Sequence, residues 1–140
     1  MCKSCLLPMK SEWFWPSLPL RLVLGIIMVY HGVPKLNGGI EQFAGMLDQA
    51  GIFLPTFFAW IVALLEVVGG VLLVVGVFPL LLSALFTVNF VVATWAKVYK
   101  WDFPFAGADK TGWEFDLLIL GAFVALLWMS ISDCMKHHNR

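Results

Sequence analysis

Glu66 is the one acidic residue in an apolar stretch, residues 59–76, that is long enough to cross a bilayer. A carboxylate near the middle of a span costs about 2.5 kcal/mol or more on insertion scales, so it usually faces other helices and has a partner. Ala59, Ala63 and Gly70 fall on the same helical face as Glu66. Because small residues let a neighbouring backbone approach, this face predicts close contact with another span around a buried acid.

Asn89 is the first expected partner of that acid. At a rise of about 1.5 Å per residue, Glu66 and Asn89 both lie about 15 Å from the turn that joins their helices. An unpaired polar group in hydrocarbon costs several kcal/mol. We therefore predict a hydrogen bond between the two side chains.

Further ionisable side chains collect near the end of the spans that lies opposite the chain termini. The candidate polar pocket comprises six residues: His31, Lys35, Glu66, Asn89, Lys97 and Glu114. The expected ion pairs are Lys97 with Glu114, and Lys35 or His31 with Glu114 or Glu66. Two interpretations stay open. The residues are either structural polar contacts between helices or a pocket for a small molecule, since ionisable residues at membrane depth indicate a functional site.

A quinone is the ligand that fits the pocket interpretation. Its carbonyl oxygens need hydrogen-bond donors, which His31 or Lys35 would supply. Aromatic side chains such as Tyr30 and Trp113 would flank its ring. The carboxylates of the pocket would then transfer protons.

Arg21 and Asp133 form a separate pair of charges toward the end of the spans that carries the termini. Arg21 stands near the start of the first span, and Asp133 ends the last span at the same depth. We expect the guanidinium either to extend to the lipid headgroups or to reach the carboxylate as a structural ion pair.

Cysteine and histidine residues occur near both ends of the chain. An even number of spans would bring four of them to one face: Cys2, Cys5, Cys134 and His137. Their C-x2-C and C-x2-H spacings are compatible with a tetrahedral zinc site. Alternatively, Cys2 and Cys5 form a redox pair, or all the thiols are inert on loosely held chain ends.

Four apolar runs must position these side chains. The chain has 140 residues, of which 61% are hydrophobic and 13% charged, unlike a soluble globular domain. The runs cover residues 18–35, 57–77, 80–98 and 113–131, each near the length of a spanning helix. No run alternates as the strands of a membrane barrel do. The sequence therefore predicts an all-α, integral membrane four-helix bundle with antiparallel, up-and-down spans.

The connections divide the chain into an N-terminal interfacial lead (1–16), a four-helix transmembrane domain (17–135) and a polar C-terminal tail (136–140). Pro16 and Pro19 would place the start of the first span near Leu18. Between spans 1 and 2, residues 41–48 are expected to form a short helix in the membrane interface. The tight turn at residues 76–79 makes spans 2 and 3 antiparallel neighbours.

The charge distribution bears on partners and orientation. The net charge is zero, so nothing indicates nucleic-acid binding. The face with both termini carries five Lys and Arg residues, against four on the other face. The positive-inside rule then predicts that both termini are cytoplasmic.

The order of several short motifs resembles the DoxX family. These motifs are Arg21 at the start of the first span, His31-Gly-x-x-Lys35 at its end, Glu66-x-x-Gly-Gly in the second span, Glu114 opening the fourth and Ser132-Asp133 closing it. The resemblance covers about residues 20–133. It implies a four-helix integral membrane protein of prokaryotes, some relatives of which are linked to thiosulfate:quinone oxidoreductase or to membrane oxidoreductase complexes. The Cys2 and Cys5 lead is outside the family pattern.

The sequence and the resemblance leave three functions, in order of preference. The first is an accessory subunit of an energy-transducing membrane complex, without chemistry of its own. The second is a quinone-linked oxidoreductase subunit of the thiosulfate:quinone type, and the third is a small-solute transporter. The implied partners are the lipid bilayer and other membrane subunits, in the inner (cytoplasmic) membrane of a prokaryote.

Overall fold

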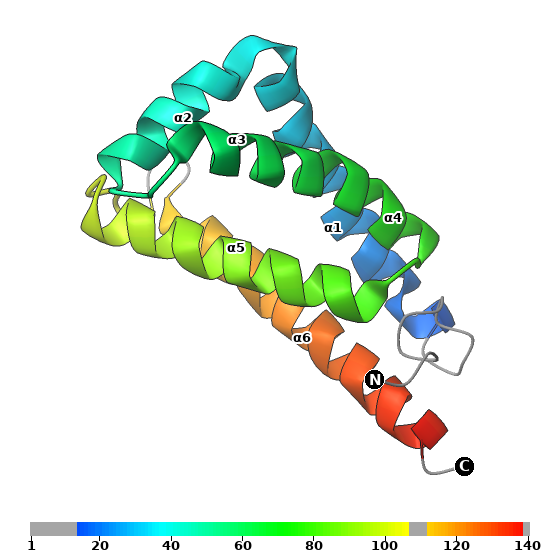
Figure 1. Ribbon diagram of the computed structural model, residues 1–140. Coiled ribbons are helices and arrows are strands. Elements are labelled where there is room, and N and C mark those ends of the chain that lie inside the picture. Colours follow the sequence, from blue (N-terminus) through cyan, green and yellow to red (C-terminus); the bar gives the residue numbers. More distant parts are fainter. Residues whose placement is uncertain (1–13, 107–111, 139–140) are drawn as a thin grey trace.

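Helices account for most of the computed structural model, which describes residues 14–106 and 112–138 (Figure 1). Four runs of helix are long and apolar enough to cross a membrane. The runs contain α1 (Phe14–Pro34); α3 (Pro55–Leu64), η3 (Leu65–Gly69) and α4 (Gly70–Val75); α5 (Pro79–Tyr99); and α6 (Trp113–His138). The predicted all-α bundle of four spans is confirmed, and no strand occurs among the described residues.

α1 differs from the prediction at its start. It begins at Phe14 rather than near Leu18, because Pro16 lies in the first turn, where backbone N–H groups have no acceptor within the helix. At its other end, the kinked segment η2 (Lys35–Gly39), in which Asn37 and Gly38 leave helical φ/ψ values, redirects the chain. Gly38 in this turn has a φ of +104°, which glycine adopts without steric cost.

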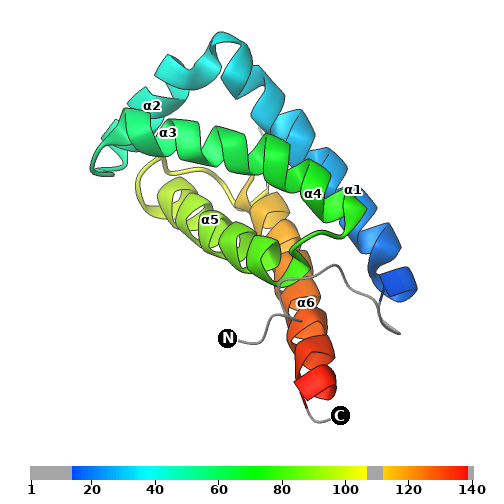
Figure 2. The ribbon, with the colours of Figure 1, turned by 45° about the vertical axis from the view of Figure 1, so that its right-hand side comes forward.

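The chain then folds back along span 2 as α2 (Ile40–Gln49), which lies beside α3 in both views (Figures 1 and 2). The apolar contact consists of Ile40, Ala44 and Leu47 of α2 with Ala59 and Ala63 of α3. The opposite face of α2 exposes Glu41 and Asp48. A short amphipathic helix between spans 1 and 2 is therefore confirmed, and it buries part of the small-residue face of span 2.

Glycines bring α1 very close to span 2. A Cβ atom on Gly25 would lie 2.6 Å from the carbonyl oxygen of Gly70, and one on Gly32 would lie 2.8 Å from the Cβ of Glu66. Larger residues at these positions would push the helices apart. The end of α1 is consequently held beside the middle of span 2.

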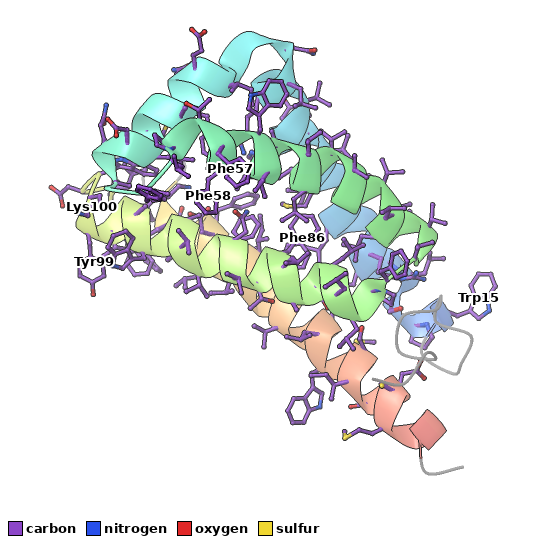
Figure 3. The ribbon with its side chains drawn as sticks, viewed as in Figure 1. Trp15, Phe57, Phe58, Phe86, Tyr99 and Lys100 are labelled. Atoms are coloured by element: carbon purple, nitrogen blue, oxygen red, sulfur yellow. The ribbon has the colours of Figure 1, made fainter. Side chains whose placement is uncertain are left out.

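Aromatic rings fill the centre of the bundle, where α5 packs on α6. The ring centroids of Phe86 and Phe123 are 4.8 Å apart, and those of Phe90 and Phe123 are 5.8 Å apart. Figure 3 shows Phe86 between α5 and span 2, where it and Leu82 face Gly69. Spans 2 and 3 are thus antiparallel neighbours, as the tight turn predicted, but bulky side chains stand between their backbones.

Candidate functional site

Lys35 and Glu66 form an ion pair where α1 crosses span 2. The Nζ of Lys35 lies 2.5 Å from the Oε2 of Glu66, and Glu66 is only 5% exposed. Lys35 begins the kinked segment η2, and Glu66 lies in the π-helical turn η3 in the middle of span 2. Gly32, three residues before Lys35, allows the close approach. This pair is one of those that the sequence predicted.

The helix α2 covers this ion pair with an aromatic ring. The Nζ of Lys35 lies 4.4 Å from the centroid of the half-buried Phe43, within the range of a cation–π interaction. The ammonium group therefore joins three elements: η2, which carries it, η3, which supplies the carboxylate, and α2, which supplies the ring.

A second ion pair, between Lys97 and Asp116, links the end of α5 to the start of α6. The Nζ of Lys97 lies 2.9 Å from both carboxylate oxygens, and Asp116 is 4% exposed. The Nζ of Lys97 also lies 5.9 Å from the centroid of the Phe103 ring. This pair has the same composition as the first: a lysine, a buried carboxylate and a phenylalanine ring.

The predicted ion pair between Lys97 and Glu114 is wrong, because Lys97 pairs with Asp116. Glu114 and Asp116 are two residues apart on one helix, so their side chains point to different sides, and Asp116 is the one that faces α5. The Oε2 of Glu114 is buried and has no hydrogen-bond partner in the described part of the chain.

His31 lies near the end of α1, four residues before Lys35. The charges of Lys35, Lys97 and Asp116 all act on its imidazole. The residue is exposed, and its ring lies edge-on to Tyr30 with centroids 6.2 Å apart. The imidazole is therefore accessible beside the ring of Tyr30.

Asn89 does not join this cluster. The carboxylate of Glu66 accepts a hydrogen bond from Lys35, and within residues 14–106 no hydrogen bond connects it to Asn89. The predicted Glu66–Asn89 bond is wrong, because equal depth does not fix lateral distance. Phe86 and Leu82 occupy the space between α5 and span 2.

Arg21 and Asp133 lie elsewhere, near the start of α1 and the end of α6. They are 0% and 8% exposed, so Arg21 does not extend to the headgroups as one alternative proposed. Both side chains take part in interactions. A direct ion pair between them stays a prediction.

The proposed zinc ligands fall largely outside the described residues. Cys2 and Cys5 lie there, as does the side chain of His137. Cys134 is disulfide-bonded, whereas zinc takes the thiolate form of cysteine. A zinc site that includes Cys134 would require reduction of that bond, and both the zinc set and the Cys2–Cys5 redox pair stay predictions.

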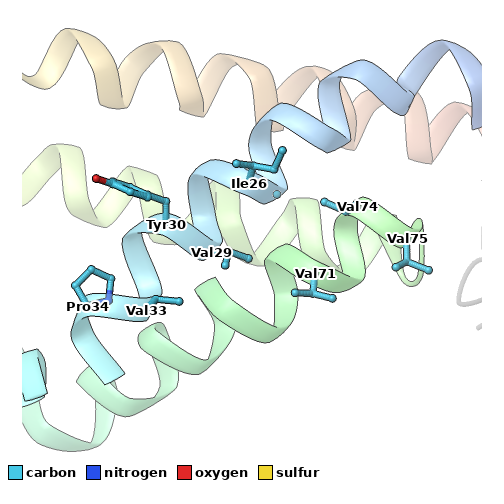
Figure 4. A pocket seen from close by; sticks show the side chains of 9 residues that line it. Ile26, Val29, Tyr30, Val33, Pro34, Val71, Val74 and Val75 are labelled. Atoms are coloured by element: carbon cyan, nitrogen blue, oxygen red, sulfur yellow. The ribbon is translucent and has the colours of Figure 1, made fainter. Parts of the chain in front are cut away.

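An apolar groove of about 570 Å³ lies between α1 and α4 (Figure 4). Its lining residues are Gly25, Ile26, Val29, Tyr30, Val33, Pro34, Val71, Val74 and Val75. Tyr30, which was expected to flank a quinone ring beside the polar residues, lines this groove instead and is 77% exposed. The charged residues of the two ion pairs do not line the groove, but Tyr30 does, and its ring lies edge-on to that of His31, so the groove adjoins this end of α1.

The two ion pairs and the phenylalanine rings beside them form a polar cluster. Three of its residues were not among the candidate site residues predicted from the sequence: Asp116, Phe43 and Phe103. A signal for the rings does exist, because a phenylalanine follows Lys35 by eight positions and Lys97 by six, each in the connection after a span. Asp116 was visible as the second acid at the start of span 4, but spacing alone did not select it over Glu114.

The fold and the cluster define a multi-pass membrane protein of four spans with two ion pairs buried between them. The sequence profile of the DoxX family matches residues 17–98, and the chain belongs to the DoxX family. It is 36% identical over 106 residues, 74% of this chain and 71% of the relative, to the Bacillus subtilis (strain 168) protein named "Putative oxidoreductase CatD". No solved structure matches the chain significantly.

Proposed function

We propose that this protein is an accessory integral membrane subunit of a prokaryotic electron-transfer complex, and that its polar cluster binds a quinone headgroup. The observation that carries the proposal is the ion pair between Lys35, which follows α1, and Glu66, which is buried in the middle of span 2. Ionisable groups at such depth are costly and usually serve ligands or protons. The name of the Bacillus subtilis relative, an oxidoreductase, agrees with this class of function.

The chemistry of the cluster suits a quinone. A quinone carbonyl oxygen accepts hydrogen bonds, and an ammonium group placed against it stabilises the negative charge that develops on reduction. Two electrons from a redox partner and two protons convert the quinone into a hydroquinone. In this proposal the carboxylates of Glu66 and Asp116 pass those protons, while the electrons come from another subunit of the complex.

The proposal extends to location. The protein would lie in the cytoplasmic membrane, where quinones are dissolved in the lipid, with both termini on the cytoplasmic side by the distribution of basic residues.

Binding of added quinone to the purified chain tests the proposal. The chain would be reconstituted in lipid nanodiscs and titrated with a short-chain benzoquinone, with tryptophan fluorescence as the readout. We expect saturable binding by the wild type, and at least tenfold weaker binding by Glu66→Gln. Glu41→Gln, an exposed residue of α2, is the matched control and should bind as the wild type does.

A folded wild-type chain that binds no quinone would overturn the proposal. Size-exclusion chromatography and circular dichroism would establish that each variant is folded. In that case the ion pairs serve the packing of the spans alone, and the protein acts as a structural subunit.

A further inference from the structure

Cys134, near the C-terminal end of α6, is disulfide-bonded. The chain contains three cysteines, and the other two are Cys2 and Cys5 of the N-terminal lead. Because the structure holds a single chain, the sulfur of Cys134 is bonded to one of these two lead cysteines, although both lie outside the described residues. The disulfide therefore joins the N-terminal lead covalently to the end of span 4.

An odd number of cysteines leaves one thiol beside this disulfide. One lead cysteine is bonded to Cys134, and the other stands three positions away from it in the C-x-x-C motif. Thiol–disulfide exchange proceeds by attack of a thiolate on one sulfur of a disulfide. Cysteines at C-x-x-C spacing are also able to bond to each other, as they do in disulfide oxidoreductases. The chain thus carries a disulfide and a thiol suited to attack it.

The position of Cys134 favours exchange over a fixed structural bond. Cys134 is half-buried in α6, between the buried Asp133 and the exposed Met135, and exchange depends on access to the sulfur. On the cytoplasmic side proposed above for both termini, disulfides are usually transient and either catalytic or redox-sensing. A bond that only braced the fold would be exposed there to reducing thiols.

We propose that Cys2, Cys5 and Cys134 form a thiol–disulfide exchange site that attaches the N-terminal lead to α6 and releases it. The thiolate of one lead cysteine attacks the sulfur of the other. The bond to Cys134 breaks, a Cys2–Cys5 bond forms, and Cys134 leaves as a thiolate. One disulfide and one thiol are present before and after, so the step needs no oxidant or reductant. This inference goes beyond the proposed function and does not use the quinone site.

Reoxidation of the reduced chain in nanodiscs tests the exchange. The full chain would be reduced with a phosphine, freed of the reductant and oxidised with one equivalent of diamide. Samples quenched at intervals with N-ethylmaleimide would be digested, and mass spectrometry would quantify each disulfide. Circular dichroism would establish that the reduced chain and each variant are folded. The variants are Cys134→Ser, which removes the exchange partner, and Cys2→Ser and Cys5→Ser, which each leave one lead cysteine.

We expect the Cys2–Cys5 bond to form first in the wild type, because its thiols are close in the sequence. This bond should then decline while the bond to Cys134 rises, since the structure holds the joined form. Tenfold dilution of the nanodiscs should change the conversion rate by no more than about twofold, because the step is intramolecular. Cys134→Ser should keep the Cys2–Cys5 bond, and a variant with one lead cysteine should show the Cys134 bond without a second form.

Three results would overturn the inference. The first is a bond to Cys134 that forms without any Cys2–Cys5 bond, which indicates a fixed brace. The second is a Cys2–Cys5 bond that forms in the folded chain and never converts. The third is a bond between the Cys134 residues of two chains, seen as a dimer on a non-reducing gel. Quinone titration of Cys134→Ser should match the wild type, so failure of the exchange and failure of the proposed function are distinguishable.

Discussion

The energetic asymmetry of the Lys35–Glu66 pair gives a specific prediction about stability. At 2.5 Å, two unit charges attract each other by about 7 kcal/mol at an effective dielectric constant of about 20. Burial of both ions offsets most of this attraction, but loss of one partner leaves an uncompensated charge, which costs about 3–5 kcal/mol. The two partners differ, because the lysine side chain is 21% exposed and the glutamate side chain 6%.

Lys35→Met should therefore lower the free energy of unfolding by about 3–5 kcal/mol, since it strands the buried carboxylate. Glu66→Gln should lower it by about 1–2 kcal/mol, since a partly exposed ammonium group can extend toward water. The double variant should lie within about 2 kcal/mol of the wild type, which gives a coupling energy of about 2 kcal/mol or more.

Unfolding in mixed micelles, with increasing SDS and circular dichroism as the readout, measures these differences. Lys100→Met serves as the control for loss of an exposed lysine. Two results would contradict this prediction: losses in the free energy of unfolding that add in the double variant, or a larger loss for Glu66→Gln than for Lys35→Met.

Three further predictions use the same unfolding assay. Gly32→Ala should destabilise the protein by about 1–3 kcal/mol, as overpacking does, whereas Gly121→Ala, where a Cβ meets nothing within 4 Å, should be neutral or stabilising; equal effects would contradict the close helix crossing. Asp116→Asn should destabilise by more than 1 kcal/mol, because it leaves Lys97 unpaired, while Glu114→Gln should be neutral or stabilising, and the reverse order would contradict the assigned ion pair. Phe43→Leu should lower the free energy of unfolding by about 0.5–2 kcal/mol, and Phe43→Trp should retain the wild-type value. A tryptophan variant as unstable as the leucine variant would show that the ammonium group does not contact the ring face.

Apolar length and composition were sufficient to predict the four spans, because lipid leaves helices as the simplest way to satisfy backbone groups. The close packing of the small-residue face of span 2 was also predictable, and Ala59 and Ala63 on this face are 0% exposed. The burial of Glu66 followed from its cost in lipid, and its pairing with Lys35 was among the expected alternatives. The positions of the polar residues therefore predicted the Lys35–Glu66 ion pair as one of the alternatives.

Which polar residues pair with one another depends on how the helices pack side by side. The depth of a residue along its helix does not give the distance to a neighbouring helix. Glu66 and Asn89 were matched by their distance along two helices, but the bulk of Phe86 separates those helices, while Gly32 brings α1 close. The choice of Asp116 over Glu114 depended on the rotation of α6 about its axis. The first outcome follows from side-chain volume at Gly32 and Phe86.

The central claim is that a quinone binds at the polar cluster rather than in the apolar groove between α1 and α4. Photolabelling with an azido-benzoquinone, followed by proteolysis and mass spectrometry of the labelled peptides, tests it most directly. We expect label on the segments around His31 and Lys97, and loss of that label when excess naphthoquinone competes. Label confined to the groove residues around Val71 and Val75, with none near the two lysines, would contradict it.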